Sequence, residues 1–473
     1  MADPRGFLEA GRVPMPERDP AERVHDYGEI FGTLPEAELR EQAARCMDCG
    51  VPFCNNACPL GNLIPDWNDL ARVGDWKRAI EQLHATNNFP EFTGLICPAP
   101  CESACVLGID DDPVMIKQIE YWTINHAFEQ GWVLAEPPAV RTGKTVAVVG
   151  SGPAGMAVAA ELNKVGHTVT VYERDEAPGG FMRFGVPDAK LEKWMIDRRI
   201  DLLAAEGIEF VCDTEAGRDI GADELRANHD ALVLTVGSRV ERDLEVPGRE
   251  LGGVHFAMEY LYQRNRWIAA REGRPSREPS REISARGKRV IVVGGGDTGM
   301  DCISNALREE ATDAILLDVY PELPESGRYP HTPWPTQPRR LHTTYALDEG
   351  GKRTFGRQVL ALEGAGDRVE RVHAREVTGS SASTAVPVEG SEFSLEADLV
   401  LIAVGFTHPE HDGLLADLGV ALDSRGNVKA GAYATNVDRV YAAGDARVGA
   451  TLIVTAIAEG RRCARVVEAA LRD

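Results

Sequence analysis

The sequence predicts an α/β protein with two parallel-sheet units of the dinucleotide-binding type, preceded by a smaller α-helical domain. Three observations lead to this prediction. Two glycine-rich turns, at residues 150–155 and 294–299, each follow an apolar strand and precede a helical segment. Helical patterns fill the chain before Glu136, whereas strands and helices alternate from Lys144 onward. Seven of the ten cysteines lie between Cys46 and Cys105, inside the helical part.

Composition excludes several classes of function. The chain has 473 residues, of which 43% are hydrophobic and 26% charged, as expected of a globular protein with several domains. A formal net charge of −23 argues against nucleic-acid binding, which needs clustered Lys and Arg. The N-terminus lacks the pattern of a signal peptide, and we find no long uncharged apolar run that would span a membrane. We therefore expect a cytoplasmic protein whose cysteines are metal ligands or thiols, not disulfides.

Three helical patterns and a linker define the N-terminal part. The patterns cover Ala37–Arg45, Trp67–His84 and Met115–Gln130. Gly131 and the run from Glu136 to Pro138 then interrupt any regular structure, because Gly and Pro are the strongest local breakers. The helical domain should therefore end near these residues.

The first glycine-rich turn has the full context of a dinucleotide site. Gly150 should make a tight turn after the strand, Gly152 should let a pyrophosphate approach the backbone, and Gly155 should let the following helix pack closely on the strand. The pyrophosphate would lie at the helix N-terminus, where free N–H groups and the dipole favour anions. Glu173 ends the second strand, at the position where a carboxylate accepts hydrogen bonds from a ribose.

The second turn repeats this arrangement. Val290–Val293 is an apolar strand, and the turn that follows contains Gly294, Gly295, Gly296 and Gly299. Two further residues of the turn, Asp297 and Thr298, stand where an N-cap belongs, and Asp318 ends the next strand, at the position that matches Glu173. The chain therefore carries two candidate dinucleotide sites.

Two such units resemble the two-dinucleotide flavoproteins of the glutathione and adrenodoxin reductase type. The segments 231–237 (ALVLTVG) and 399–405 (LVLIAVG) are similar to the strands that cross between the two domains of that family, and 439–446 (RVYAAGDA) to its late flavin motif. The resemblance implies that the first unit binds FAD and the second binds NADPH or NADH. Hydride transfer then depends on positioning, so we assign no catalytic residue.

The same resemblance gives the expected contacts and domain boundaries. FAD should contact Gly150, Gly152, Pro153, Ala154, Gly155, Glu173, Gly180, Gly237, Gly444 and Asp445. The nicotinamide dinucleotide should contact Gly294, Gly295, Gly296, Asp297, Thr298 and Asp318. We expect the helical domain at 1–140, the two parts of the FAD domain at 141–250 and 398–473, and the inserted NAD(P)H domain at 251–397.

The cysteines form two groups with the spacing of metal ligands. Cys46, Cys49, Cys54 and Cys58 are followed by Pro59, and a second group comprises Cys97, Cys101 and Cys105. Four closely spaced cysteines that end in Cys-Pro are typical of proteins with two iron–sulfur clusters. Structural zinc is the alternative, although its paired CxxC spacing is poorly matched here. Seven thiolates are one short of two four-cysteine clusters, and Gln118 and Glu120 offer oxygen ligands nearby.

From end to end the chain resembles the small (beta) subunit of glutamate synthase. The opening ADPRGFLEAGR, the run RCMDCGVPFC, the segment PGGFMRFGVPDAKLEKWMIDRR and the stretches GGGDTGMDC and PHTPWPTQP carry the likeness. The N-terminal domain is also similar to the cluster domain of dihydropyrimidine dehydrogenase. The resemblance implies two 4Fe–4S clusters, one held by Cys46, Cys49, Cys54 and Cys105, the other by Cys58, Cys97, Cys101 and Glu120.

The resemblance also implies a partner and a reaction. Electrons would pass from NAD(P)H through FAD and the clusters to an FMN-containing large subunit, which makes L-glutamate from 2-oxoglutarate and L-glutamine. The same module could instead serve a pyrimidine reductase, a ferredoxin or a stand-alone reaction, or the chain could be a flavin-binding scaffold without turnover. The nucleotide stays open: Asp318 favours NADH, whereas Arg328, Arg339 and Arg340 further on could favour NADPH.

Overall fold

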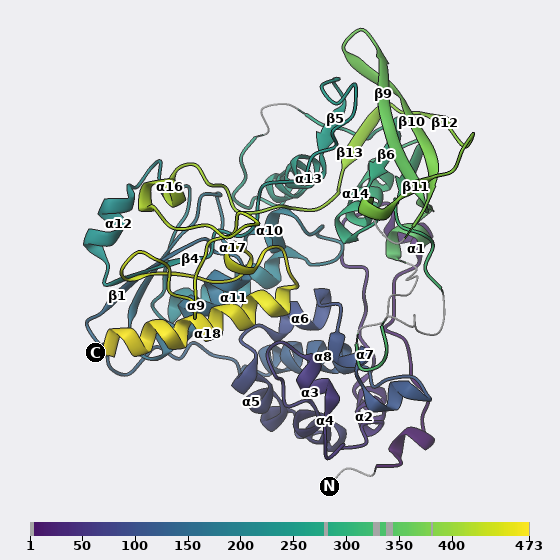
Figure 1. The fold of residues 1–473 in the computed structure, drawn as a ribbon. Helices are drawn as coiled ribbons and strands as arrows, with labels where there is room; N and C mark the ends of the chain where they lie inside the picture. Colours follow the sequence, from purple (N-terminus) through teal and green to yellow (C-terminus); the bar gives the residue numbers. More distant parts are fainter. Residues whose placement is uncertain (1–3, 279–281, 325–331, 337–343, 380–381, 473) are drawn as a thin grey trace.

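The computed structural model describes residues 4–278, 282–324, 332–336, 344–379 and 382–472. Most of the N-terminal helices form a domain that lies against the first of two α/β domains, whereas residues 20–23 lie beside the second α/β domain (Figure 1). This arrangement confirms the predicted fold class of a two-dinucleotide α/β protein with a helical domain before it. None of the helices in the described ranges combines the length and the apolar character needed to cross a lipid bilayer.

The helical domain is built from short helices. They are η1 (Gly6–Leu8), α1 (Pro20–Arg23), α2 (Glu36–Ala44), α3 (Phe53–Ala57), α4 (Ile64–Val73), α5 (Trp76–Thr86), α6 (Pro90–Ile96), α7 (Pro100–Ser103), η2 (Val106–Ile109) and α8 (Ile116–Glu129). The single helix expected over 67–84 is wrong. Gly74 ends α4 in the left-handed conformation, at φ +77°, and the Asp75 carboxylate accepts a hydrogen bond from the backbone N–H of Arg78 to start α5.

The first α/β domain contains a parallel five-stranded sheet of order β14-β4-β1-β2-β3. Its strands are β1 (Thr145–Val149), β2 (Thr168–Tyr172), β3 (Glu209–Val211), β4 (Ala231–Leu234) and β14 (Val440–Ala442). Its helices are α9 (Pro153–Lys164), α10 (Phe181–Phe184), α11 (Lys193–Ala205), α12 (Ala222–Asn228), α16 (Leu414–Leu418), α17 (Asp445–Val448) and α18 (Ile453–Arg472). Gly460 lets α18 cross α9 closely, since a Cβ there would lie 2.3 Å from the carbonyl oxygen of Ala154.

The second α/β domain has a parallel sheet of order β5-β13-β6-β7-β8. Its strands are β5 (Val254–Phe256), β6 (Arg289–Val293), β7 (Asp313–Leu317), β8 (Lys352–Thr354) and β13 (Leu399–Ile402), and its helices are α13 (Ala257–Arg271), α14 (Asp297–Arg308) and α15 (Tyr345–Asp348). The expected boundary at 397/398 assigned β13 to the FAD domain. The structure instead pairs β13 with β5 and β6, because its apolar side chains complete the core of the second sheet.

A small antiparallel sheet, which we had not expected, packs on the second domain. Its strands are β9 (Arg357–Ala365), β10 (Arg368–Thr378), β11 (Val386–Pro387) and β12 (Phe393–Glu396), with η3 (Ala382–Thr384) beside them. The long hairpin of β9 and β10 extends from the molecule in Figure 1. Buried side chains of β9 and β10 share a core with β6 and β13, so the hairpin belongs to the inserted domain.

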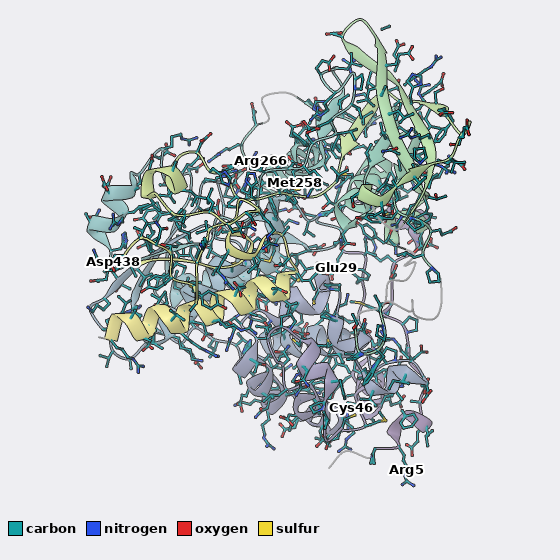
Figure 2. The ribbon with its side chains drawn as sticks, viewed as in Figure 1. Arg5, Glu29, Cys46, Met258, Arg266 and Asp438 are labelled. Atoms are coloured by element: carbon teal, nitrogen blue, oxygen red, sulfur yellow. The ribbon has the colours of Figure 1, made fainter. Side chains whose placement is uncertain are left out.

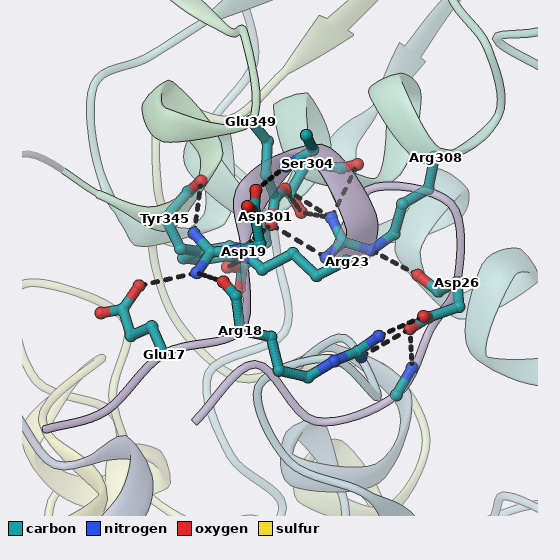
Figure 3. Close-up of polar contacts among 12 residues, drawn as sticks. Glu17, Arg18, Asp19, Arg23, Asp26, Asp301, Ser304, Arg308, Tyr345 and Glu349 are labelled. Atoms are coloured by element: carbon teal, nitrogen blue, oxygen red, sulfur yellow. Dashed lines mark hydrogen bonds and ion pairs between the residues drawn. The ribbon is translucent and has the colours of Figure 1, made fainter. Parts of the chain in front are cut away.

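Buried ion pairs hold the three domains together. Arg199 of the first α/β domain donates two hydrogen bonds to Glu91 of the helical domain, at 2.6 and 2.9 Å. The N-terminal segment also reaches the second α/β domain, where the fully buried Arg23 pairs with Glu349 at 2.9 Å (Figure 3). Arg308 contacts the same Glu349 carboxylate and the backbone oxygen of Asp26. The Arg199–Glu91 pair ties the helical domain to the first α/β domain, and the contacts around Glu349 tie the N-terminal segment to the second.

Candidate cofactor sites

A cleft opens at the first glycine-rich turn and runs between the turn and the C-terminal segment of the domain. Eight of the ten residues expected to contact FAD line it: Gly150, Gly152, Pro153, Ala154, Glu173, Gly180, Gly237 and Asp445. The remaining two, Gly155 and Gly444, lie behind the wall of the cleft, where a Cβ would collide with neighbouring atoms. Most of the residues expected at this site therefore line the cleft.

The three glycines of the turn have distinct surroundings. Gly150 has φ +101°, and a Cβ there would lie 2.4 Å from the carbonyl oxygen of Thr235. A Cβ on Gly155 would lie 1.9 Å from the carbonyl oxygen of Gly150, so only glycine allows α9 to pack on the turn. Around Gly152, by contrast, a Cβ would meet nothing within 4 Å, because this residue faces the open cleft at the N-terminus of α9. The turn thus leaves free N–H groups toward a space that a pyrophosphate would fill.

Glu173 lies beside this turn and is buried. Its Oε2 accepts hydrogen bonds from the backbone N–H (3.0 Å) and the hydroxyl (2.5 Å) of Ser151, and its Oε1 accepts one from the backbone N–H of Asp175. The carboxylate is therefore held in place at the end of β2. It is positioned to accept hydrogen bonds from a ribose.

The far end of the cleft contains Asp445, on the first turn of α17. Burial raises the pKa of its carboxyl to about 6, partly offset by hydrogen bonds that Thr451 donates from its hydroxyl and backbone N–H. Sequence reasoning did not find the ion pair between Arg174 and Glu410, 2.5 Å apart at the edge of the cleft. These two residues are 236 positions apart, and no local pattern links them.

The second glycine-rich turn has the same geometry as the first. Gly294 has φ +121°, a Cβ on Gly299 would lie 2.3 Å from the carbonyl oxygen of Gly294, and a Cβ on Gly296 would meet nothing within 4 Å. The expected N-cap at Asp297 or Thr298 is wrong, because Gly296 is the N-cap of α14 and no side chain caps this helix. The helix N-terminus is consequently open to a bound anion.

Asp318 lies directly after β7 and is buried against this turn. A Cβ on Gly295 would lie 1.9 Å from its Oδ2, so the carboxylate occupies the space that glycine leaves. Sequence reasoning saw no adjacent arginine, but the structure places Arg353 there, with its Nη2 2.6 Å from Asp318 Oδ2. Arg353 stands on β8, which pairs with β7, and only the strand order could have revealed it. Arg328, Arg339 and Arg340 lie outside the described residues.

The cysteines line two cavities of similar size. The outer thiol cavity is bordered by Cys46, Cys49, Cys54 and Cys105. The inner thiol cavity is bordered by Cys58, Cys97, Cys101 and Glu120. These two sets are the ones that the sequence resemblance implied. No three His, Cys, Asp or Glu side chains in the described ranges are spaced to hold one metal ion; the cysteines surround cavities instead.

Glu120 replaces a fourth cysteine around the inner cavity. Its Oε1 accepts hydrogen bonds from Asn87 (2.8 Å) and Thr93 (2.6 Å), and Oε2 makes none among the described residues. Burial raises the pKa of the carboxyl to about 7. Gln118, the other oxygen donor that we considered, does not line the inner cavity. The arrangement leaves one oxygen of Glu120 available to a metal.

Burial makes these thiols poor acids on their own. It raises the pKa of Cys46, Cys54 and Cys97 to about 12, and it raises the pKa of Cys101 well above its usual value. Positive charge inside each cavity is needed to stabilise the thiolates, and iron ions would supply it. The residues therefore fit two iron–sulfur clusters, and the turn and its cleft fit a dinucleotide.

The cleft adjoins the inner thiol cavity, and the inner cavity adjoins the outer one, because neighbouring or shared residues line them. Ile96 lines the cleft, and the next residue, Cys97, lines the inner cavity. In the same way Ile453 lines the cleft and Val454 the inner cavity. Ile64 and Ile116 border both thiol cavities, and Figure 2 shows Cys46 of the outer cavity in the helical domain.

Two family models match the chain. Residues 144–460 match the pyridine nucleotide-disulphide oxidoreductase model, and residues 23–132 match the model described as dihydropyrimidine dehydrogenase domain II, 4Fe-4S cluster. The first model confirms an NAD(P)H-dependent oxidoreductase domain that binds FAD, and the second confirms a 4Fe–4S cluster domain.

Curated relatives match over the full length of the chain. It is 50% identical to the protein named glutamate synthase [NADPH] small chain of Mycobacterium tuberculosis, over 99% of this chain and 96% of that one. It is 42% identical to the glutamate synthase [NADH] of Saccharomyces cerevisiae, over 99% of this chain and 22% of that protein. Among solved structures, FprA of M. tuberculosis in complex with NADPH has a TM-score of 0.53 at 17% identity, over 70% of this chain and 85% of that one. This last likeness supports the fold.

Proposed function

The chain belongs to the family of glutamate synthase small chains, and on this premise we propose that it oxidises NAD(P)H at FAD and delivers the electrons through two 4Fe–4S clusters to a large chain. That large chain would bind FMN and form L-glutamate from 2-oxoglutarate and L-glutamine. When bound, FAD accepts a hydride and the clusters carry its electrons singly. The observation that supports this proposal best is the unbroken series of cleft, inner cavity and outer cavity.

The glycine-rich turns bind and orient the two dinucleotides. Gly152 and Gly296 leave open space at the N-termini of α9 and α14, which would each hold a pyrophosphate. Glu173 would hold the ribose next to the first pyrophosphate, and Asp445 would contact the ribityl chain at the other end of the cleft. These contacts position the reacting rings, which is the main contribution a protein makes to hydride transfer.

The two sets of ligands differ in exposure. Cys58, Cys97 and Cys101 of the inner set are all buried, whereas in the outer set only Cys105 is buried and Cys46, Cys49 and Cys54 are partly exposed. Val51, in the loop between Cys49 and Cys54, is 62% exposed. The inner cavity thus faces the cleft and the outer cavity faces the surface, so electrons would leave the protein near Val51.

The test uses the full-length protein together with a purified large chain of the same family. NADPH or NADH should support glutamate formation from 2-oxoglutarate and glutamine only when both chains are present. The small chain alone should oxidise the nucleotide with an artificial acceptor such as ferricyanide. Oxidation of the nucleotide without complex formation and without glutamate would contradict the proposed partner and reaction, while leaving the oxidoreductase activity in place.

A further inference from the structure

The two dinucleotide units carry their carboxylates at matching positions, but different groups surround them. Glu173 accepts hydrogen bonds from neutral donors, namely Ser151 and the backbone N–H of Asp175. Among the described residues it has no ion pair. The first site therefore presents an uncompensated negative charge beside the ribose, which suits hydroxyl groups and repels a phosphate.

Asp318 has a cation as its main partner. Arg353 Nη2 donates to Asp318 Oδ2 at 2.6 Å and to the carbonyl oxygen of Gly295 at 3.0 Å. The Asp318 side chain is 3% exposed and that of Arg353 is 13% exposed. In the first unit the turn residue Ser151 donates its hydroxyl to Glu173, but the matching residue of the second turn is Gly295. Within the described ranges Asp318 therefore has no serine hydroxyl beside it that would compete with Arg353. The second site is therefore close to neutral at the ribose-binding position.

Arg353 has donors left over after these contacts. A guanidinium has five N–H groups, and in the described part of the chain the Nε and Nη1 atoms of Arg353 make no hydrogen bond. The Nε atom is also buried, which is costly for a polar atom without a partner. The aromatic ring of Phe355 lies 4.7 Å from the guanidinium carbon and supports its plane. The contact of Nη2 with Gly295 holds the guanidinium beside the glycine-rich turn.

We propose that Arg353 is the residue that selects the nucleotide, by binding the 2′-phosphate of NADPH with its Nη1 group, unpaired among the described residues, while its Nη2 group neutralises Asp318. Arginine matches the geometry of phosphate oxygens and binds them with charge-assisted hydrogen bonds. The prediction from Asp318 alone favoured NADH, and Arg353 reverses it. This inference rests on the proposed function only in assuming that the second unit binds a nicotinamide dinucleotide.

The first test measures binding without catalysis. Calorimetric titration of the FAD-loaded protein with 2′,5′-ADP, which carries the 2′-phosphate, and with 5′-AMP, which lacks it, should show tighter binding of 2′,5′-ADP. Arg353→Gln should weaken 2′,5′-ADP by roughly tenfold to a hundredfold and leave 5′-AMP unchanged, because a charged hydrogen bond is lost. Arg357→Gln, which removes a nearby arginine paired with Glu376, should change neither affinity.

The second test measures turnover and guards against misfolding. Arg353→Gln leaves the Asp318 carboxylate buried and unpaired, so the double variant Asp318→Asn/Arg353→Gln removes both charges together. In both variants the ratio of kcat/KM for NADPH to kcat/KM for NADH should fall by roughly tenfold to a hundredfold, because only NADPH loses the contact of its 2′-phosphate with Arg353. Unchanged 2′,5′-ADP affinity in Arg353→Gln, or equal losses for NADH and NADPH in the double variant, would overturn the role of Arg353. Failure of the wild-type protein to oxidise either nucleotide would instead contradict the proposed function.

Discussion

Ile96 lines the flavin cleft, and its chain neighbour Cys97 lines the inner thiol cavity. Helix α6 ends between these two residues, and Cys97 continues in an extended conformation. One peptide bond therefore joins the walls of the two sites. The inner ligand set therefore adjoins the flavin cleft, and this contact underlies the predicted route of electrons.

Metal analysis tests the two thiol cavities. After anaerobic purification the protein should contain about eight iron and about eight acid-labile sulfide per chain, as two 4Fe–4S clusters require. The two cavities have similar volumes and four candidate ligands each. Elemental analysis for iron and zinc together is the measurement. Stoichiometric zinc without iron would contradict this assignment and favour the structural-zinc alternative.

The open space at Gly152 predicts how FAD binding can be abolished. Gly152→Val places a branched side chain where the pyrophosphate lies, so the purified variant should contain little or no FAD. Gly221→Val is the matched control, because Gly221 is also a helix N-cap with extended backbone angles and nothing within 4 Å of a Cβ. Flavin content is measured by absorbance after the protein is denatured. Normal FAD in Gly152→Val would place the pyrophosphate elsewhere.

Glu120 and Gln118 provide a matched pair on helix α8. Glu120→Ala removes the oxygen that borders the inner cavity, and we expect iron to fall from about eight to about four per chain. Gln118→Ala removes a buried side chain that does not line the cavity and whose amide has no partner among the described residues, so iron should stay near eight. Iron content and low-temperature EPR spectra check both variants. Equal iron loss in the two would mean that the helix, not the carboxylate, supports the cluster.

Glu29 makes stability depend on pH. Burial raises the pKa of its carboxyl from 4.5 to about 7, partly offset by the hydrogen bond that Tyr121 donates. Between these two values the folded state holds more protons than the unfolded state, so the free energy of unfolding falls as pH rises through this window. Glu29→Gln imitates the protonated carboxyl, so the decrease in Tm as pH rises from 4.5 to about 7 should be smaller in this variant than in the wild type. Calorimetry at several pH values measures Tm for each protein. The control is Glu22→Gln, which changes an exposed side chain and should show the same dependence of Tm on pH as the wild type.

The sequence predicted best where the chemistry is local. Each turn, at 150–155 and 294–299, is found next to its carboxylate as expected, because the motif combines a strand, a turn and a helix that are adjacent in the chain. The two ligand sets join cysteines that are distant in the chain, and the family resemblance, not local chemistry, grouped them correctly. Arg353 and the pair of Arg174 with Glu410 were missed, since strand order and long-range packing bring them into place. The two helices joined at Gly74 were read as one because both present apolar faces at the same period.

Anaerobic reduction of the purified full-length protein by NADPH and by NADH tests the central claim most directly. Visible spectra follow the flavin, and EPR spectra at low temperature follow the clusters. We predict that at least one nucleotide bleaches the flavin absorbance within the time of turnover, and that excess reductant then produces the EPR signal of reduced 4Fe–4S clusters. A flavin that stays oxidised with both nucleotides but is reduced by dithionite would contradict the claim that this chain takes electrons from NAD(P)H.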